Sequence, residues 1–201
     1  MVDTAYLRGR APETVAQALA DGGADLIQLR AKNASLETVL RLAEAILPVT
    51  ERAGIGLIIN DHPDIALAVG APGCHLGQAD FFGAGHSRVA ELSPPASRLW
   101  VGLSSSAPAY AERAVAAGAD YLGVGPVFPT PTKPEAQPVT LEYVRWAAAH
   151  LALPWFAIGG INLDTLEAVL AAGARRVCVV SALLNAPDLA QACQQFKERL
   201  R

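Results

Sequence analysis

The chain has 201 residues, 52% of them hydrophobic and 17% charged, and its formal net charge is −3. This balance favours a compact core over disorder, and we expect a single domain over residues 1–201. It argues against nucleic-acid binding and against a membrane span, because the chain has no basic cluster longer than Arg175-Arg176 and no apolar run of ~18 residues.

Apolar, strand-like runs alternate with Ala-rich, helix-like stretches along the whole chain. In chain order we expect a strand at 5–8, a helix at 12–21, a strand at 26–29, a helix at 36–53, a strand at 56–60, a helix at 63–69, a strand at 74–76, a helix at 87–92, a strand at 99–104, a helix at 107–117, a strand at 121–124, a helix at 141–150, a strand at 154–158, a helix at 163–172, a strand at 177–180 and a helix at 186–200. Short strands that are apolar throughout are typical of a parallel sheet covered on both faces.

One phrase recurs, in which an Ala-rich stretch ends at a glycine and an apolar run follows. Its glycines are Gly23, Gly70, Gly118 and Gly173, at intervals of 47, 48 and 55 residues. Glycine ends a helix readily because it adopts the left-handed conformation without a Cβ penalty. Each interval holds two strand–helix units, so the whole chain holds eight.

Eight such units predict an α/β fold, a closed (β/α)8 TIM barrel. An open doubly wound sheet is the alternative, but the Gly-x-Gly-x-x-Gly turn typical of its first strand is absent from the sequence. The active site of a barrel lies at the carboxyl ends of its strands. We therefore expect the polar residues that follow the strands to surround one mouth.

Two carboxylates follow neighbouring strands of this predicted barrel. Asp61 comes directly after the third strand, and Asp80 follows the fourth. Together with substrate phosphate oxygens they indicate a Mg²⁺ site, whereas the sequence has no His/Cys cluster of the kind that binds zinc. Asp61 precedes Pro63 and is equally well placed to cap the next helix, and a turn position is the alternative role of Asp80.

Cationic residues are predicted at the same edge. Arg30 and Lys32 end the second strand, and Lys133 lies in the loop after the sixth. Arginine makes bidentate contacts to phosphate and lysine acts as a point charge. A single strand-end cation is more often a surface charge, but the coincidence with Asn60 and Asp61 indicates a diphosphate or polyphosphate ligand bound with a divalent metal.

A second anion site is predicted at the last two strands. Gly159-Gly160 follows the seventh strand and Ser181 the eighth, where small residues let backbone N–H groups approach a phosphate. The loop at 125–140 holds five prolines together with Lys133 and is long enough to cover the mouth as a lid. A rigid surface excursion is the alternative for this loop.

These phrases together resemble the thiamine phosphate synthase family, also called thiamine phosphate pyrophosphorylase. The matching phrases lie between residues 18 and 183 and are Gln28-Leu29-Arg30-x-Lys32, Ile59-Asn60-Asp61, His75-Leu76-Gly77-Gln78-x-Asp80, Gly102-x-Ser104, Gly125-Pro126-Val127-Phe128-Pro129-Thr130-x-Thr132-Lys133, Ile158-Gly159-Gly160-Ile161 and Val179-Val180-Ser181-Ala182. The His-Leu-Gly-Gln and Gly-Pro-Val-Phe-Pro-Thr-x-Thr-Lys phrases are specific, whereas many phosphate-binding barrels share Gly-Gly-Ile.

The resemblance implies a Mg²⁺-dependent transferase of thiamine biosynthesis. Such an enzyme joins 4-amino-2-methyl-5-hydroxymethylpyrimidine diphosphate to 4-methyl-5-(2-phosphoethyl)thiazole, or its carboxylate, and releases thiamine phosphate and pyrophosphate. By this resemblance, the residues that bind Mg²⁺ are Asp61 and Asp80. Those that hold the diphosphate are Asn60 and the catalytic set of Arg30, Lys32, Ser104 and Lys133. Those that line the pyrimidine pocket are Gln28 and His75. Those that bind the thiazole phosphate are Thr130, Thr132, Gly160, Val180 and Ser181.

The chain departs from the family pattern at Ala31, where an acidic residue is usual, and at 6–10, which lacks the usual Tyr-Leu-Val-Thr-Asp. Two alternatives stay open. A thiazole tautomerase would use a histidine near the end of the fifth strand, where this chain has serines at 104–106. A non-catalytic barrel that senses thiamine phosphates would not need the full metal set, which this chain retains.

Cys74, Cys178 and Cys193 are odd in number and far apart, so we expect reduced thiols and neither disulfides nor a zinc site. The N-terminus lacks a signal-peptide pattern, and we expect a cytoplasmic protein. The expected partners are small phosphorylated substrates, with no nucleic acid and no membrane. The sequence leaves open whether the chain forms a homo-oligomer.

Overall fold

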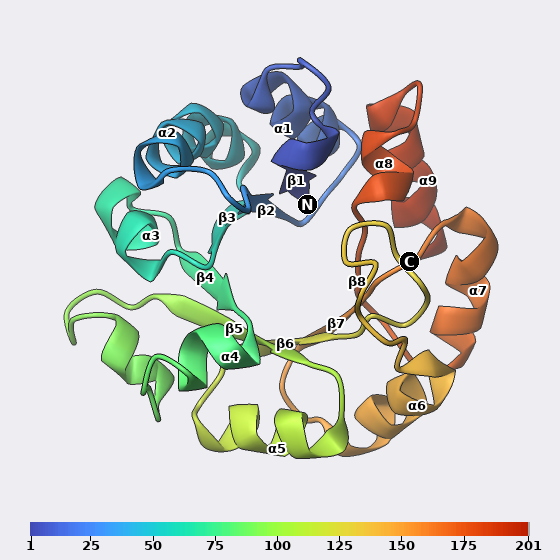
Figure 1. Cartoon of the computed structure of the whole chain (residues 1–201). Helices are drawn as coiled ribbons and strands as arrows, with labels where there is room; N and C mark the ends of the chain where they lie inside the picture. The colour runs from blue at the N-terminus through green and yellow to red at the C-terminus, as the bar shows by residue number, and fades with distance from the viewer. Residues whose placement is uncertain (201) are drawn as a thin grey trace.

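The computed structural model describes residues 1–200, a curled parallel sheet inside a ring of helices (Figure 1). The strands are β1 (Val2–Asp3), β2 (Leu26–Arg30), β3 (Gly56–Asn60), β4 (Gly73–Leu76), β5 (Trp100–Ser105), β6 (Tyr121–Val124), β7 (Trp155–Ile158) and β8 (Val177–Cys178). The helices are α1 (Pro12–Asp21), α2 (Leu36–Ala53), α3 (Pro63–Val69), α4 (Gln78–Phe82), α5 (Pro108–Ala116), α6 (Thr140–His150), α7 (Leu163–Ala171), α8 (Ser181–Leu184) and α9 (Leu189–Arg199), with the 3-10 helices η1 (Thr4–Tyr6) and η2 (Val89–Leu92).

The order of the strands confirms the predicted (β/α)8 barrel. Each strand pairs in parallel with the next one along the chain, from β1 to β8, without the reversal that a doubly wound sheet requires. At the seam between β8 and β1, the Met1 ammonium donates a hydrogen bond of 3.1 Å to the carbonyl oxygen of Val179. Helices α1 and α9 pack against each other beside this seam, so the first and last units complete the ring.

The recurring glycines lie where the chain turns from a helix towards the next strand. Gly23, Gly70, Gly118 and Gly173 all have φ between 75° and 101°. Side chains rarely adopt this conformation, which explains why the phrase uses glycine. Gly173 is doubly constrained, since a Cβ there would lie 2.6 Å from the Cβ of Ala148.

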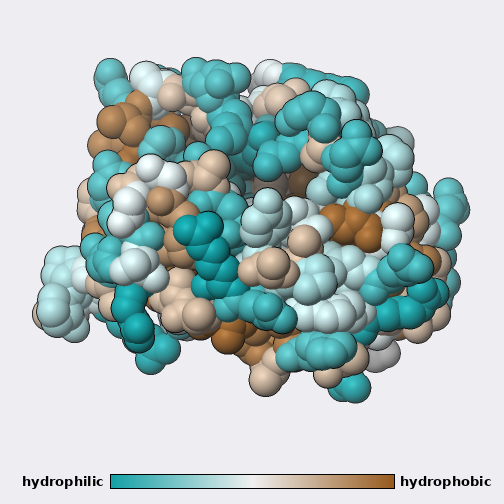
Figure 2. All heavy atoms as spheres, turned by 60° about the horizontal axis from the view of Figure 1, so that its bottom comes forward, coloured by the Kyte–Doolittle hydropathy of each residue, from teal (hydrophilic) through white to brown (hydrophobic). Residues whose placement is uncertain are grey.

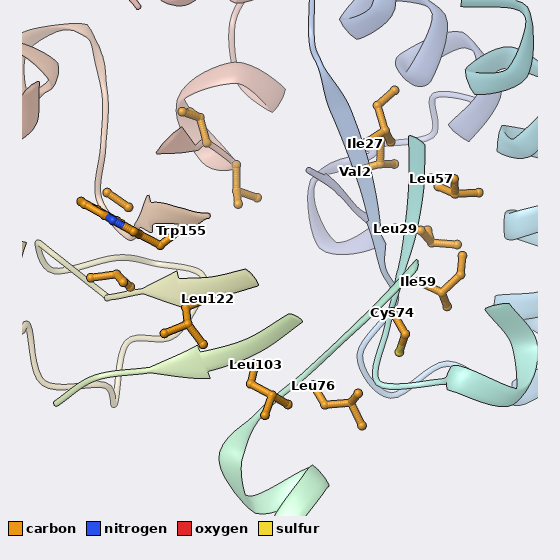
Figure 3. Packing of buried hydrophobic residues seen from close by; sticks show 14 of the residues in the cluster. Val2, Ile27, Leu29, Leu57, Ile59, Cys74, Leu76, Leu103, Leu122 and Trp155 are labelled. Carbon is orange, nitrogen blue, oxygen red and sulfur yellow. The ribbon is translucent and has the colours of Figure 1, made fainter. Parts of the chain in front are cut away.

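Side chains alternate between the two faces of each strand. In β2, Ile27 and Leu29 are buried, whereas Gln28 and Arg30 line the interior of the barrel. Figure 3 shows the buried apolar layer, which continues through neighbouring strands in residues such as Leu57. Burying one such side chain contributes roughly 1.5–3 kcal/mol. This layer therefore fixes which residues of each strand face the cavity.

The first strand lies earlier than predicted, and the expected strand at 5–8 is wrong. β1 is Val2–Asp3 and pairs with the end of β2. The chain then enters η1, because the carboxylate of Asp3 accepts a hydrogen bond of 3.0 Å from the N–H of Ala5. An acidic residue in this position starts a helical turn instead of extending a strand.

The structure also differs from the prediction at two helices. The segment at 87–92 holds only the 3-10 helix η2, and the helix that directly follows β4 is the unpredicted α4. The helix expected at 186–200 begins only at Leu189. Its N-cap is Asp188, whose carboxylate accepts a hydrogen bond of 2.9 Å from the N–H of Gln191.

Hydrophobic residues are scattered over the outer surface. On the face turned forward in Figure 2 they form small separate patches among hydrophilic residues. The large exposed ones include Leu36 in α2 and Tyr110 and Val115 in α5. Within residues 1–200, no helix is both long enough and apolar enough to cross a bilayer.

Candidate active site

The interior of the barrel holds one cavity of about 830 Å³, a volume typical of small-molecule sites. Most of the predicted site residues line it, namely Gln28, Arg30, Asn60, His75, Asp80, Ser104, Thr130, Thr132, Lys133, Gly160, Val180 and Ser181. The fold therefore brings the separate phrases of the sequence together. Lys32 and Asp61 are the two predicted residues that lie outside the cavity lining.

Lys32 and Asp61 bind each other. Nζ of Lys32 is 2.6 Å from Oδ2 of Asp61, whose side chain is 18% exposed. Asp61 has a φ of 67°, a left-handed conformation that costs a non-glycine residue on the order of 1–3 kcal/mol. Its N–H donates a hydrogen bond of 2.8 Å to the carbonyl oxygen of His75. His62, and not Asp61, is the N-cap of α3, so the capping alternative for Asp61 is wrong.

Arg30 also has a carboxylate partner inside the protein. Its Nη1 lies 2.6 Å from Oδ2 of Asp3, a side chain that is only 1% exposed. The parallel register places Asp3 of β1 directly beside Arg30 of β2, so the sheet itself sets this ion pair. The pair holds the guanidinium in one orientation at the cavity wall.

Asp80 lies in the first turn of α4 and lines the cavity, so it is a helix residue and not the turn residue of the alternative. Its carboxylate folds back over Gly77, where a Cβ would lie 2.6 Å from Oδ2. Glycine at this position leaves the space that the carboxylate occupies. The His-Leu-Gly-Gln phrase therefore positions Asp80 through its glycine.

A chain of polar side chains crosses the floor of the cavity. Nε2 of His75 lies 3.0 Å from Oγ of Ser104, and Nδ1 of His75 lies 3.2 Å from the hydroxyl of Tyr121. Burial lowers the pKa of His75 to about 4; the nearby Asp61 carboxylate opposes this effect and the Lys133 ammonium adds to it. His75 is therefore neutral at physiological pH.

The turn after β7 packs closely against the start of the loop that follows β6. Gly159 and Gly160 have φ values of 99° and 66°, and a Cβ on Gly160 would lie 2.6 Å from the carbonyl oxygen of Pro129. The N–H of Val127 donates a hydrogen bond of 2.8 Å to the carbonyl oxygen of Ile158. The missing side chains leave room for this loop, and both glycines also line the cavity, where backbone N–H groups can bind a phosphate.

The remainder of the loop after β6 lies in front of β8 in Figure 1. Its residues Thr130, Thr132 and Lys133 line the cavity. Oγ1 of Thr132 lies 3.3 Å from the hydroxyl of Tyr6, which belongs to η1. The loops after β1 and β6 therefore meet across the mouth, an arrangement compatible with the predicted lid.

Three residues that contact predicted site residues were not foreseen: Asp3, Tyr6 and Tyr121. Two of them carried a signal in the sequence. Asp3 follows an apolar residue at a strand end, as Asp61 does, and Tyr121 shares its strand face with Gly123, two residues on. Tyr6 carried none, because its contact depends on how two loops fold.

Comparisons with known proteins show which family the chain belongs to. The family model described as thiamine monophosphate synthase matches residues 1–183. The chain belongs to the thiamine monophosphate synthase family. It is 47% identical over 184 residues to the thiamine-phosphate synthase of Thermus thermophilus, which covers 89% of this chain and 84% of that relative.

Two further members of the thiamine monophosphate synthase family support the assignment. The thiamine-phosphate synthase of Gloeobacter violaceus is 50% identical over 188 residues, 94% of this chain and 53% of the relative, so the chain spans about half its length. The solved thiamine phosphate pyrophosphorylase from Pyrococcus furiosus has a TM-score of 0.85 and 34% identity, covering 96% of this chain and 90% of that one. The family places the chain among the transferases of thiamine biosynthesis, and the comparisons support neither the tautomerase nor the sensing alternative.

Proposed function

We propose that the protein joins 4-amino-2-methyl-5-hydroxymethylpyrimidine diphosphate to 4-methyl-5-(2-phosphoethyl)thiazole, or its carboxylate, in a Mg²⁺-dependent reaction that releases pyrophosphate. The observation that carries the proposal is that one cavity collects charged side chains and a glycine turn. Arg30, Asp80 and Lys133 line it, and so does the Gly159-Gly160 turn. We propose that the charged side chains bind a diphosphate substrate and that the turn binds a monophosphate substrate.

Asp61 and Asp80 are the residues that would hold Mg²⁺. Both offer carboxylate oxygens, the ligands that this ion prefers, and Gly77 leaves room for the Asp80 carboxylate. Among residues 1–200, no group of three His, Cys, Asp or Glu side chains lies close enough to hold a metal by itself. This donor set fits an ion that completes its coordination with water and substrate phosphate. When bound, Mg²⁺ would neutralise charge that develops on the departing diphosphate.

Cationic and hydroxyl side chains are proposed to stabilise the same departing group. Arg30 is fixed by Asp3, Lys133 extends from the loop after β6, and Ser104 lies at the end of β5. Together with Lys32, which is paired with Asp61 outside the cavity lining, they are proposed to supply donors to the charge that forms as the C–O bond breaks, which is the most effective use of such groups. Asn60, also in the cavity wall, adds an uncharged donor.

The opposite side of the cavity is proposed to anchor the thiazole phosphate. The proposed ligands are Thr130, Thr132, Gly160, Val180 and Ser181, all of which line the cavity. Anchoring the phosphate holds the ring nitrogen near the methylene carbon of the pyrimidine. Positioning of this kind replaces a bimolecular encounter with a reaction inside one complex.

His75 and Gln28 are proposed as walls of the pyrimidine pocket. The pKa of His75 is about 4, so its imidazole does not carry a proton for the reaction at neutral pH. This agrees with a mechanism in which the leaving group departs by ionisation and needs no general base. We further propose a cytoplasmic location, supported by three cysteines that form no disulfide. Homo-oligomer formation stays a prediction to be tested.

Pyrophosphate release from purified protein tests the proposal directly. Product should form when both substrates and Mg²⁺ are present and should stop when the metal is chelated. Protein that binds the thiazole phosphate but releases no pyrophosphate in the presence of Mg²⁺ would contradict the synthase function.

The Asp80→Asn variant tests the metal side of the site. It keeps the shape of the side chain and removes its charge, so turnover should fall about 100-fold or more while thiazole phosphate still binds. Asp64→Asn is the matched control, because Asp64 is an exposed carboxylate in the first turn of α3. Full activity of Asp80→Asn would remove Asp80 from the metal site.

A further inference from the structure

Tyr121 and His75 come together across an intervening strand. The parallel registers align His75 of β4 with Gly102 of β5, and Gly102 with Tyr121 of β6. A Cβ on Gly102 would overlap the ring of Tyr121, so only glycine lets that ring cross β5. A Cβ on Gly123 would likewise come within 3.2 Å of Cε1 of His75. Two glycines thus make the space in which the two side chains meet.

The hydrogen bonds of His75 can run in only two directions. A neutral imidazole has one N–H donor and one acceptor nitrogen. In the first arrangement the Tyr121 hydroxyl donates to Nδ1, and Nε2–H donates to Oγ of Ser104. In the second, Ser104 donates to Nε2, and Nδ1–H donates to the hydroxyl oxygen of Tyr121.

Each arrangement leaves one hydroxyl proton without a protein acceptor, and the first is favoured because it gives an acceptor to the buried hydroxyl of Tyr121. Burial raises the pKa of Tyr121 above its usual range, so the phenol keeps its proton, and that proton needs a hydrogen-bond acceptor. His75 is the only hydrogen-bond partner of that hydroxyl among residues 1–200. The second arrangement leaves the phenol proton without a protein acceptor, which is unfavourable inside a barrel. The first gives the phenol proton an acceptor and leaves only the proton of Ser104 free, which can point into the cavity that Ser104 lines.

We propose that Tyr121 is a positioning residue that holds His75 in its Nε2–H tautomer and thereby directs the hydroxyl proton of Ser104 towards the diphosphate. The identity of that acceptor rests on the proposed function, whereas the direction of the relay rests on the fold alone. An oxyanion can only accept hydrogen bonds, so a serine that donates its proton to histidine cannot also donate it to phosphate. By donating to Nδ1, Tyr121 stops His75 from competing with phosphate for the hydroxyl proton of Ser104, and it does so without contacting the phosphate itself.

The tautomer of His75 is the first test. Nitrogen-15 NMR of the ligand-free protein should show a protonated Nε2 and an unprotonated Nδ1 for His75. In Tyr121→Phe the ring still packs against Gly102 and Phe156, but the donor to Nδ1 is lost, and the Nδ1–H form should appear. Tyr143→Phe is the control, since its hydroxyl bonds to Ser105 and Ala107 on the outer side of β5. A wild-type His75 that carries Nδ1–H would overturn the relay, whether or not the protein is a synthase.

Steady-state kinetics is the second test. Tyr121→Phe should raise the KM for the pyrimidine diphosphate about 10-fold, the effect of losing one hydrogen bond to a charged group, and leave the KM for the thiazole phosphate within about twofold. In a Ser104→Ala background the same change should have little further effect, because Tyr121 acts through Ser104. Additive effects, or an unchanged diphosphate KM, would overturn the positioning role. Failure of the proposed function would look different, as no pyrophosphate would form from wild-type protein while the NMR result would stand.

Discussion

Replacing His75 by glutamine should change how the stability of the protein responds to acid. Burial lowers the pKa of His75 to about 4, from 6.5 in an unfolded chain. The imidazole is neutral in both states above pH 6.5, so its contribution to stability is fully present there. As the pH falls from 6.5 towards 4, the unfolded chain takes up the proton first, and the folded state loses stability.

The two pKa values set the size of this loss. Between pH 7 and pH 5 it amounts to at most about 2 kcal/mol of the free energy of unfolding, because one pKa unit corresponds to about 1.4 kcal/mol. Glutamine is polar and similar in length but has no group that titrates in this range. His75→Gln is therefore expected to lack the loss, although its stability at pH 7 is lower because the cavity floor is disturbed.

Urea unfolding at pH 7 and pH 5 measures the effect in wild type and variant. Carboxylates titrate in both proteins, and their contributions cancel when the loss in free energy of unfolding between pH 7 and pH 5 is compared. The wild type should therefore lose about 2 kcal/mol more of this free energy than His75→Gln. His150→Gln is the control, because His150 is exposed at the end of α6 and should leave the wild-type difference unchanged. Equal losses in wild type and His75→Gln would show that the imidazole is already charged or fully hydrated in the folded protein, and would refute the reasoning.

Three further substitutions probe the barrel itself by urea unfolding. Asp3→Asn leaves the guanidinium of Arg30 without its carboxylate and should cost about 3 kcal/mol; a loss below about 1 kcal/mol would mean that water replaces the ion pair. Gly102→Ala forces a methyl group into the ring of Tyr121 and should cost about 1–3 kcal/mol, so unchanged stability would place the ring elsewhere. Leu166→Ala empties a fully buried site in α7 and should cost about 2–5 kcal/mol, and a smaller effect would show that the core closes over the gap.

Much of the fold could be predicted from the sequence because the same local rule applies in each unit. Glycines such as Gly118 and Gly173 end their helices with positive φ, and the apolar runs after them become strands of the barrel. The first unit escaped prediction for a physical reason. Its strand is only Val2–Asp3, too short to show a pattern, and it is defined by pairing with β2, not by local propensity. The Asp3 side chain then starts η1, where Tyr6 would otherwise suggest a strand.

The site was foreseen as a set of residues but not as a set of contacts. Knowing that a polar residue follows a buried strand was enough to place Asn60, Asp80 and Ser104 in one cavity. Nothing in local sequence shows that Lys32 binds Asp61, because that contact depends on how two loops settle. The role of Tyr121 was equally hidden, since it depends on strand register and on a glycine in a different strand.

The two ion pairs at the mouth have a consequence for which anions can enter. Before any ligand arrives, Arg30 is matched by Asp3 and Lys32 is matched by Asp61, so these two cations offer little uncompensated charge. Free inorganic phosphate would have to separate Lys32 from Asp61 and leave a bare carboxylate behind. Under the proposed function, a diphosphate that arrives with its own divalent cation would offer a partner to each member of that pair. The resting protein would in this way discriminate against the abundant phosphate of the cell before any contact with the pyrimidine is made.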